Sequence, residues 1–184
     1  MEQRLRRLLE QRQKVRITDP SRTRAAVLVP MFLKNGDWYL LFIKRTNLVR
    51  VHKGQISFPG GAYEEHDGSL LNTALREAAE EIGLAADDIQ ILGELDDQES
   101  ITTNYVITPF LGLIPHLYHF RLDRHEVQEL LEVPISALLG KDNQHTEILP
   151  DKRVSYSYRY GNELIWGATA RILKPLLEIL RETL

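Results

Sequence analysis

The chain has 184 residues, of which 43% are hydrophobic and 27% are charged, and its formal net charge is −3. This length suits one compact domain over residues 1–184, and the charge gives no general attraction to nucleic acid or to anionic membranes. The chain has no cysteine, which excludes disulfides, thiolate metal ligands and a cysteine nucleophile. No apolar run approaches the roughly 20 residues of a membrane span, and the N-terminus lacks the apolar region of a secretory signal. We therefore expect a cytoplasmic protein.

The first predicted element is a basic surface helix at about residues 1–13, where leucines recur at helical spacing. Two apolar, β-prone runs then flank Asn35-Gly36, which is a strong signal for a hairpin. Residues 55–58 read as a short strand. The helix expected next covers residues 70–82.

The second half of the chain continues the alternation of strands and helices. Strands are predicted at 89–92 and 106–114, and Pro109 in the latter indicates a sheet edge or a bulge. An acidic polar loop separates them. Residues 126–140 read as a short helix with a turn. The last predicted elements are a hairpin around Gly161-Asn162, in which Tyr156, Tyr158 and Tyr160 form one strand face, and a C-terminal helix at 168–184, which Pro175 either kinks or divides in two.

This order of elements predicts an α/β fold of the α+β kind, a mixed β-sheet that is rich in hairpins and has helices packed on it. The helix at 70–82 carries an unusual set of charges. On a helical wheel, Glu77, Glu80 and Glu81 lie opposite the apolar sector, and Gly83 is placed to end the helix as a left-handed cap. The apolar sector contains Leu71, Leu75, Ala78, Ala79 and Ile82.

Three neighbouring carboxylates on one helix repel each other by a few tenths of a kcal/mol per pair. A bound divalent cation would reverse the sign of that interaction, and carboxylate oxygens suit Mg²⁺ or Mn²⁺. An ordinary solvated helix face also carries glutamates, so both interpretations stay open. Arg76 either orients one of the carboxylates or forms a structural ion pair. Gly60-Gly61, at the end of the preceding strand, would let backbone approach a metal or a phosphate.

Residues 60–84, "GGAYEEHDGSLLNTALREAAEEIGL", resemble the characteristic box of the Nudix hydrolases. Ala78 replaces a bulky aliphatic residue of that pattern, Asp67 stands where a glutamate is usual, and the loop is one residue longer. Residues 41–61, "LFIKRTNLVRVHKGQISFPGG", resemble the second signature of the coenzyme A pyrophosphatase branch, with Thr46 as a departure. Residues 159–173 also look like that branch. The residues in register are Arg45, Arg50, Gly54, Phe58, Pro59, Gly60 and Gly61.

This resemblance implies a Nudix fold, with a mixed β-sheet sandwiched between α-helices. It also implies divalent-metal-dependent hydrolysis of coenzyme A, or a derivative, to 4′-phosphopantetheine and adenosine 3′,5′-bisphosphate. It implies that Glu77 and Glu81 ligate Mg²⁺ or Mn²⁺, that Glu80 ligates directly or through water, and that the Gly61 carbonyl adds a ligand. The general base stays open among a helix carboxylate and four other acids. Those acids are Asp96, Asp97, Glu99 and Glu126.

A basic cluster just before the box is the candidate for phosphate binding, because arginine suits bidentate contacts with phosphate. Two alternatives remain: a hydrolase of another nucleoside diphosphate derivative (ADP-ribose, a dinucleotide or an oxidised nucleotide), or a module that only binds a nucleotide. The expected partner is a small-molecule nucleotide, without nucleic acid or membrane, and a homodimer is the generic expectation. The basic cluster consists of Arg45, Arg50, His52 and Lys53.

Overall fold

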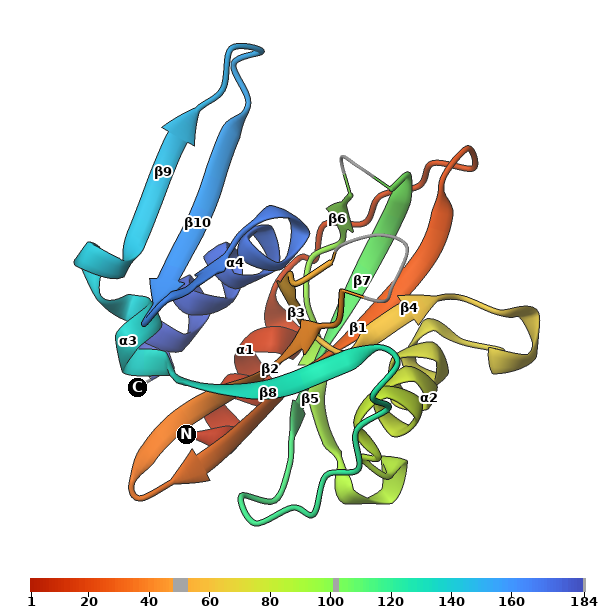
Figure 1. Cartoon of the computed structure of the whole chain (residues 1–184). Coiled ribbons are helices and arrows are strands. Elements are labelled where there is room, and N and C mark those ends of the chain that lie inside the picture. The colour runs from red at the N-terminus through yellow and green to blue at the C-terminus, as the bar shows by residue number, and fades with distance from the viewer. Residues whose placement is uncertain (48–52, 101–102, 184) are drawn as a thin grey trace.

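The computed structural model describes residues 1–47, 53–100 and 103–183, and Figure 1 shows the arrangement of its elements. The helices are α1 (Glu2–Gln11), α2 (Leu70–Ile82), α3 (Ile135–Leu139) and α4 (Gly167–Thr183). The strands are β1 (Thr23–Lys34), β2 (Asp37–Arg45), β3 (Ile56–Ser57), β4 (Gly60–Ala62), β5 (Gln90–Glu94), β6 (Gln98–Glu99), β7 (Tyr105–Leu113), β8 (Val127–Pro134), β9 (Gln144–Ile148), β10 (Val154–Tyr160) and β11 (Glu163–Ile165).

The strands form one large mixed sheet and one small antiparallel sheet. The large sheet has the order β3-β2-β1-β7-β5, with β4 beside β1, β6 beside β7 and β8 beside β2. Within it, β1 and β7 run parallel. The small sheet has the order β11-β10-β9. The hairpin predicted at Asn35-Gly36 joins β1 to β2, and its two residues have the positive φ values of 52° and 90° that such a tight turn requires.

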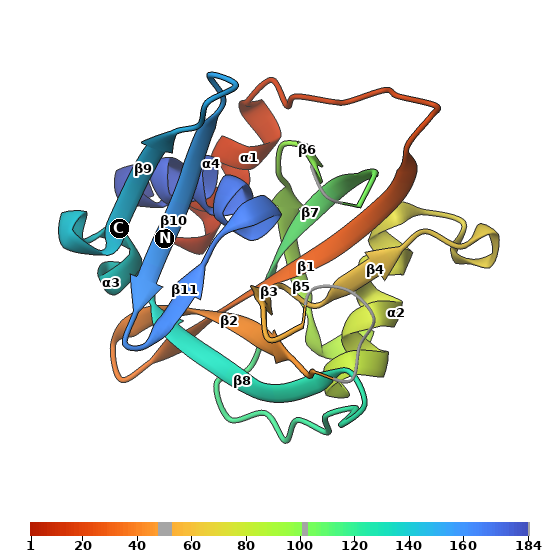
Figure 2. The same cartoon turned by 45° about the horizontal axis from the view of Figure 1, so that its top comes forward.

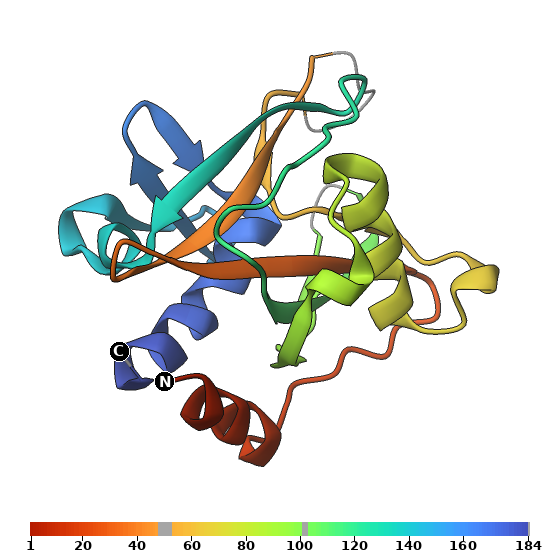
Figure 3. The same cartoon turned by 90° about the horizontal axis from the view of Figure 1, so that it is seen from below.

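Helices cover both faces of the large sheet, as the resemblance to the Nudix fold implied. Figure 3 shows α2 on one side of the sheet, and α1 and α4 on the other. The alternation along β1 explains this, because Leu28 packs in the cluster that contains the buried face of α2, whereas Val29 packs with α1 and α4. Leu41 and Phe42 of β2 divide between the two clusters in the same way.

Two predictions about individual strands are wrong. Residues 127–134 are not helical but form β8, which pairs antiparallel with β2, so sheet pairing outweighs the helical propensity of the glutamates and leucines there. The short predicted helix is limited to α3. Pro109 does not mark an edge, because β7 lies between β1 and β5; the irregularity falls instead in β5, between Ile91 and Gly93.

The C-terminal part of the chain places the small sheet against α4 (Figure 2). Tyr158 of β10 is buried, and Tyr156 and Tyr160 pack against the same cluster, so the three tyrosines do form one strand face. Pro175 lies inside α4, which runs as one helix from Gly167 to Thr183. Within the described residues, no helix is both long and apolar enough to cross a membrane.

Candidate active site

The acidic helix α2 begins and ends at capping residues that the sequence supplies. The Ser69 side chain accepts a hydrogen bond from the Asn72 amide at 3.1 Å, and Gly83 ends the helix with a left-handed φ of 68°. Ala74, Ala78 and Ile82 are buried against the sheet. The helix is therefore held firmly enough to present its glutamates at defined positions.

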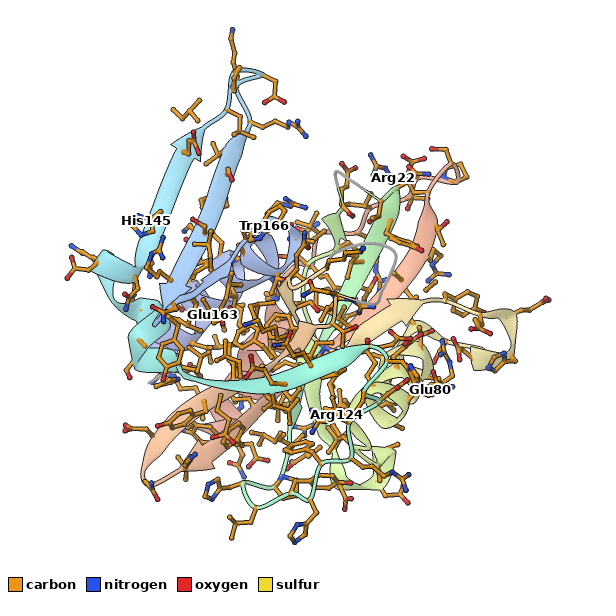
Figure 4. All side chains as sticks on the ribbon, viewed as in Figure 1. Arg22, Glu80, Arg124, His145, Glu163 and Trp166 are labelled. Carbon is orange, nitrogen blue, oxygen red and sulfur yellow. The ribbon has the colours of Figure 1, made fainter. Side chains whose placement is uncertain are left out.

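Glu81 does not project with the other two glutamates, which corrects the wheel drawn from the sequence. Its side chain is 3% exposed, because the buried face of α2 is turned toward residues 74, 78 and 81 rather than centred on the leucines. Ala79, expected to be buried, is exposed instead. Glu80 has a side chain that is 60% exposed and projects from α2, as labelled in Figure 4. The three carboxylates therefore occupy different environments.

Glu81 is enclosed by an arginine and a backbone amide. Arg45 Nη1 donates to Glu81 Oε1 at 3.1 Å, and the Gly60 amide donates to Oε2 at 3.0 Å. Burial raises the pKa of Glu81 to about 8; Arg45 and the Gly60 amide oppose this shift, and the negative charges of Glu77 and Glu126 add to it. A nearby positive charge would strongly stabilise the ionised form of this buried carboxylate.

Glu77 lies against the backbone of Gly61. A Cβ atom at Gly61 would stand 2.3 Å from Glu77 Oε1, so only glycine leaves room for this carboxylate beside β4. Burial raises the pKa of Glu77, which Arg76 partly counteracts. Gly60 is also tightly enclosed, with a Cβ position 2.3 Å from the Ala26 carbonyl oxygen. The two glycines thus bring β4 into contact with the half-buried Glu77 and the buried Glu81.

Arg76 is tied to the loop before α2 and holds two of the glutamates. Its Nε donates to Asp67 Oδ1 at 2.8 Å and its Nη2 to Asp67 Oδ2 at 3.2 Å. Its Nη1 donates to Glu77 at 2.9 Å and to Glu80 at 3.0 Å. Asp67 is buried and also accepts from the Thr73 hydroxyl, and its hydrogen bonds with Arg76 hold its pKa well below the ordinary value. Asp67 therefore positions Arg76, a role that its place in the lengthened loop did not suggest.

The basic cluster is only partly described. Arg45, at the end of β2, bridges two carboxylates, because its Nη2 also donates to Glu126 at 3.1 Å. Lys53 is exposed in the turn before β3. Arg50 and His52 lie outside the described residues.

The four acids proposed as a general base lie in three different places. Asp96 accepts from Arg12 and from the Val15 amide, both at 2.8 Å, and Asp97 accepts from the Ile17 amide at 2.9 Å and the Thr108 hydroxyl at 2.7 Å. Both aspartates thus anchor the N-terminal segment.

Glu99, in β6, has a half-exposed side chain and pairs with Arg22 at 3.6 Å. Glu126 shares Arg45 with Glu81, and its charge raises the pKa of both Glu77 and Glu81. Of the four acids, Glu126 is the one whose interactions join it to the acidic helix.

A cavity of about 530 Å³ opens beside this cluster. One wall belongs to the large sheet and contains Arg45, Gly60 and Gly61. The other wall comes from β10, α4 and the segments before them. This volume falls in the roughly 300–1,000 Å³ range of small-molecule sites. Among the described residues, Ser57 Oγ and Arg45 Nε are buried without a hydrogen-bond partner, and both residues line this cavity.

The carboxylates and the Gly61 carbonyl are hard oxygen donors of the kind that Mg²⁺ and Mn²⁺ bind. In the parts of the chain that the structure describes, no three acidic or histidine side chains already converge as a metal cage. The reason is visible in the ion pairs: Arg76 holds Glu77 and Glu80, and Arg45 holds Glu81. The donor set fits a divalent cation that would replace these guanidinium contacts.

Comparison with known proteins identifies the family of this chain. The family described as NUDIX domain matches residues 22–152. A protein of Enterobacter sp. (strain 638), named as the uncharacterized Nudix hydrolase NudL, is 36% identical over 160 residues, covering 85% of this chain and 82% of its own.

Solved structures share the fold at low identity. The NUDIX domain of Shewanella oneidensis NrtR, complexed with ADP ribose, has a TM-score of 0.57 at 18% identity, covering 90% of this chain and 93% of its own. A MutT/nudix family protein from Enterococcus faecalis has a TM-score of 0.60 at 14% identity, covering 96% of this chain and 67% of its own. From the matched domain and the NudL relative, the chain belongs to the Nudix hydrolase family, enzymes that act on phosphorus-containing anhydrides.

Proposed function

We propose that this hydrolase cleaves the pyrophosphate of coenzyme A or its derivatives, giving 4′-phosphopantetheine and adenosine 3′,5′-bisphosphate. The observation that carries the proposal is the position of the signature over residues 41–61. Its Arg45, Phe58, Gly60 and Gly61 line the cavity, and Arg45 and Gly60 also contact Glu81. This position supports the proposal that these residues contact the substrate beside the acidic helix.

Nudix hydrolases generally use divalent metal ions, and in this chain Glu77, Glu80, Glu81 and the Gly61 carbonyl would hold Mg²⁺ or Mn²⁺. A bound ion of this kind neutralises charge on the phosphate oxygens and polarises the phosphorus. Asp67 keeps Arg76 in place beside Glu77 and so limits where that carboxylate can move.

The chain's own residues supply positioning and proton transfer. We propose that Arg45 exchanges a carboxylate contact for a phosphate oxygen, which is supported by its position in the cavity lining. Water attacks one phosphorus, the bond to the bridging oxygen breaks, and the other phosphate leaves. We propose Glu126 or Glu99 as the acceptor of the water proton; Glu126 is favoured by its link to Arg45 and Glu81.

The test is a product assay with the purified protein. Coenzyme A, ADP-ribose, a dinucleotide and an oxidised nucleoside triphosphate are incubated separately, each with Mg²⁺, with Mn²⁺ and with chelator, and the products are separated by chromatography. Metal-dependent release of adenosine 3′,5′-bisphosphate, with little cleavage of the other three, is the expected result. Faster cleavage of another substrate would refute the choice of coenzyme A. Binding without turnover of any of them would favour a nucleotide-binding module.

A further inference from the structure

The cavity wall that faces the box carries two arginines of its own. Arg153 directly precedes β10 and Arg171 lies in the first half of α4, and both line the cavity. Trp166, between β11 and α4, lines it as well and remains 46% exposed. Figure 4 labels Trp166 near the start of α4. These three residues fall beyond the matched family domain, which ends at residue 152.

The two guanidinium groups are close enough to affect each other. Burial, and after it the positive charge of Arg153, lowers the pKa of Arg171. Among the described residues, Arg171 donates its hydrogen bond to a backbone oxygen, the Glu99 carbonyl, rather than to a carboxylate. Arg153 pairs with Asp151 through its Nε at 2.7 Å, and its side chain is half exposed. Two cations that border one cavity, of which Arg171 is partly desolvated, repel each other, and an anion between them would remove that repulsion.

We propose that Arg153 and Arg171 form a subsite for a second phosphate of the substrate, one outside the scissile diphosphate, and that Trp166 stacks on the attached base. The substrate class is a nucleotide that carries a phosphate monoester in addition to its diphosphate. This inference rests on the proposed function and makes it more specific.

The chemistry of the three side chains fits this class. Arginine binds phosphate through paired N–H donors, and two arginines can balance a dianion. A partly exposed tryptophan at the rim of a cavity offers a flat face for a purine. Such stacking is favourable for any of the bases. Gly60 and Gly61, which lie against Glu81 and Glu77, line the same cavity as the two arginines, so one ligand can contact both the glycines and the arginines.

The test compares ligands that differ by one phosphate. Isothermal titration calorimetry without metal gives the affinities for adenosine 3′,5′-bisphosphate and adenosine 5′-monophosphate. Steady-state kinetics with Mg²⁺ give kcat/KM for coenzyme A and for 3′-dephospho-coenzyme A. In the unmodified protein we expect the extra phosphate to improve affinity and kcat/KM by about tenfold to a hundredfold, as charge-assisted hydrogen bonds do.

Arg171→Ala and Arg153→Ala should each remove most of this preference while leaving adenosine 5′-monophosphate binding nearly unchanged. The matched controls are Arg159→Ala on β10 and Arg181→Ala on α4, exposed arginines of the same elements that do not line the cavity. Both controls should keep the preference. Arg171→Lys retains the charge but not the paired donors, so it should give an intermediate preference for the extra phosphate. This variant replaces Arg171→Ala in the test if the alanine variant does not fold.

Equal affinity of the unmodified protein for the two adenosine nucleotides would overturn the proposal, as would a preference that survives both alanine substitutions. If coenzyme A is not cleaved but the arginines still govern the preference for the bisphosphate, the subsite stands and the proposed reaction fails. If coenzyme A is cleaved no better than its dephospho form, the reaction stands and the subsite fails.

Discussion

Asp67 offers a direct test of how the box is held together, through the substitution Asp67→Asn. The asparagine keeps the size of the side chain but removes its charge and one of its two acceptor oxygens. Asp67 now accepts from two nitrogens of Arg76, from the Thr73 hydroxyl at 2.8 Å and from the Glu64 amide at 3.0 Å. The NH₂ group of the asparagine would face N–H and O–H donors, with which it cannot form hydrogen bonds.

The expected loss of stability follows from these contacts. A hydrogen bond to a charged group contributes about 1.5–3 kcal/mol, and breaking a buried ion pair costs roughly 3–5 kcal/mol. Arg76 keeps Glu77 and Glu80 as partners, which places the loss near the lower figure, at about 3 kcal/mol at pH 7. For a chain of this length, that loss lowers the melting temperature by roughly 6–12 °C.

The loss should also depend on pH with a defined sign. Arg76 depresses the pKa of Asp67 below its ordinary value of 3.8, so the unfolded chain takes up a proton before the folded one does. The stabilisation is therefore complete above the unfolded pKa and declines as pH falls through and below 3.8. Asparagine does not titrate, so the difference in free energy of unfolding between the two proteins should narrow in acid.

Urea unfolding at several pH values, from neutral down to about one pH unit below 3.8, measures both quantities. Asp87→Asn, an exposed aspartate after α2, is the matched control and should change stability little. A loss below about 0.5 kcal/mol at pH 7, the range of ordinary surface substitutions, would show that Asp67 does not hold Arg76 in this way. A gap that stays constant with pH would refute the assignment of the charged pair.

Three further sets of substitutions probe the site. Glu77→Gln and Glu81→Gln should each lower kcat by at least about a hundredfold, because substituting even a residue that only orients a metal ligand costs about 10–100-fold. The circular dichroism spectrum of both variants should stay native. Near-native rates in both variants would refute the assignment of these residues as metal ligands. Gly61→Ala should displace Glu77, because the new Cβ would stand 2.3 Å from its Oε1, and titration of Mn²⁺ should then show weaker binding; unchanged affinity would contradict that contact. Glu126→Gln should lower kcat by about 10²–10⁴ if Glu126 is the base, whereas the same loss in Glu99→Gln alone would assign that role to Glu99.

The sequence predicted well those features that depend on local chemistry. The turn at Asn35-Gly36 and the cap at Gly83 require left-handed backbone, so both could be located without knowledge of the tertiary fold. The mixed sheet with helices packed on it also followed, from the interleaved order of strands and helices along the chain. Strand β8 could not be predicted, since its residues favour a helix until β2 provides a pairing partner.

Within the site, the identity of the glutamates could be predicted but not their environments. The wheel placed Glu81 in solvent because only apolar side chains were assumed to be buried. The structure shows that Arg45 and the Gly60 amide, from two other strands, satisfy its carboxylate inside the protein. Such compensation involves residues distant in sequence, so no local pattern reports it. The role of Asp67 was hidden for the same reason, since it depends on how the longer loop folds back on Arg76.

The N-terminal segment that follows α1 has a practical consequence for anyone producing this protein. Residues Val15 and Ile17 donate backbone hydrogen bonds to Asp96 and Asp97, and Asp97 is only 7% exposed. These aspartates directly precede β6, whose Glu99 carbonyl receives Arg171 from the cavity wall. A shortened expression clone that begins at the family domain, near residue 22, would strip these partners from a buried carboxylate and loosen one rim of the substrate cavity. A domain boundary chosen by homology would therefore disturb Arg171, which lies more than a hundred residues further along the chain, and so change the measured kinetics.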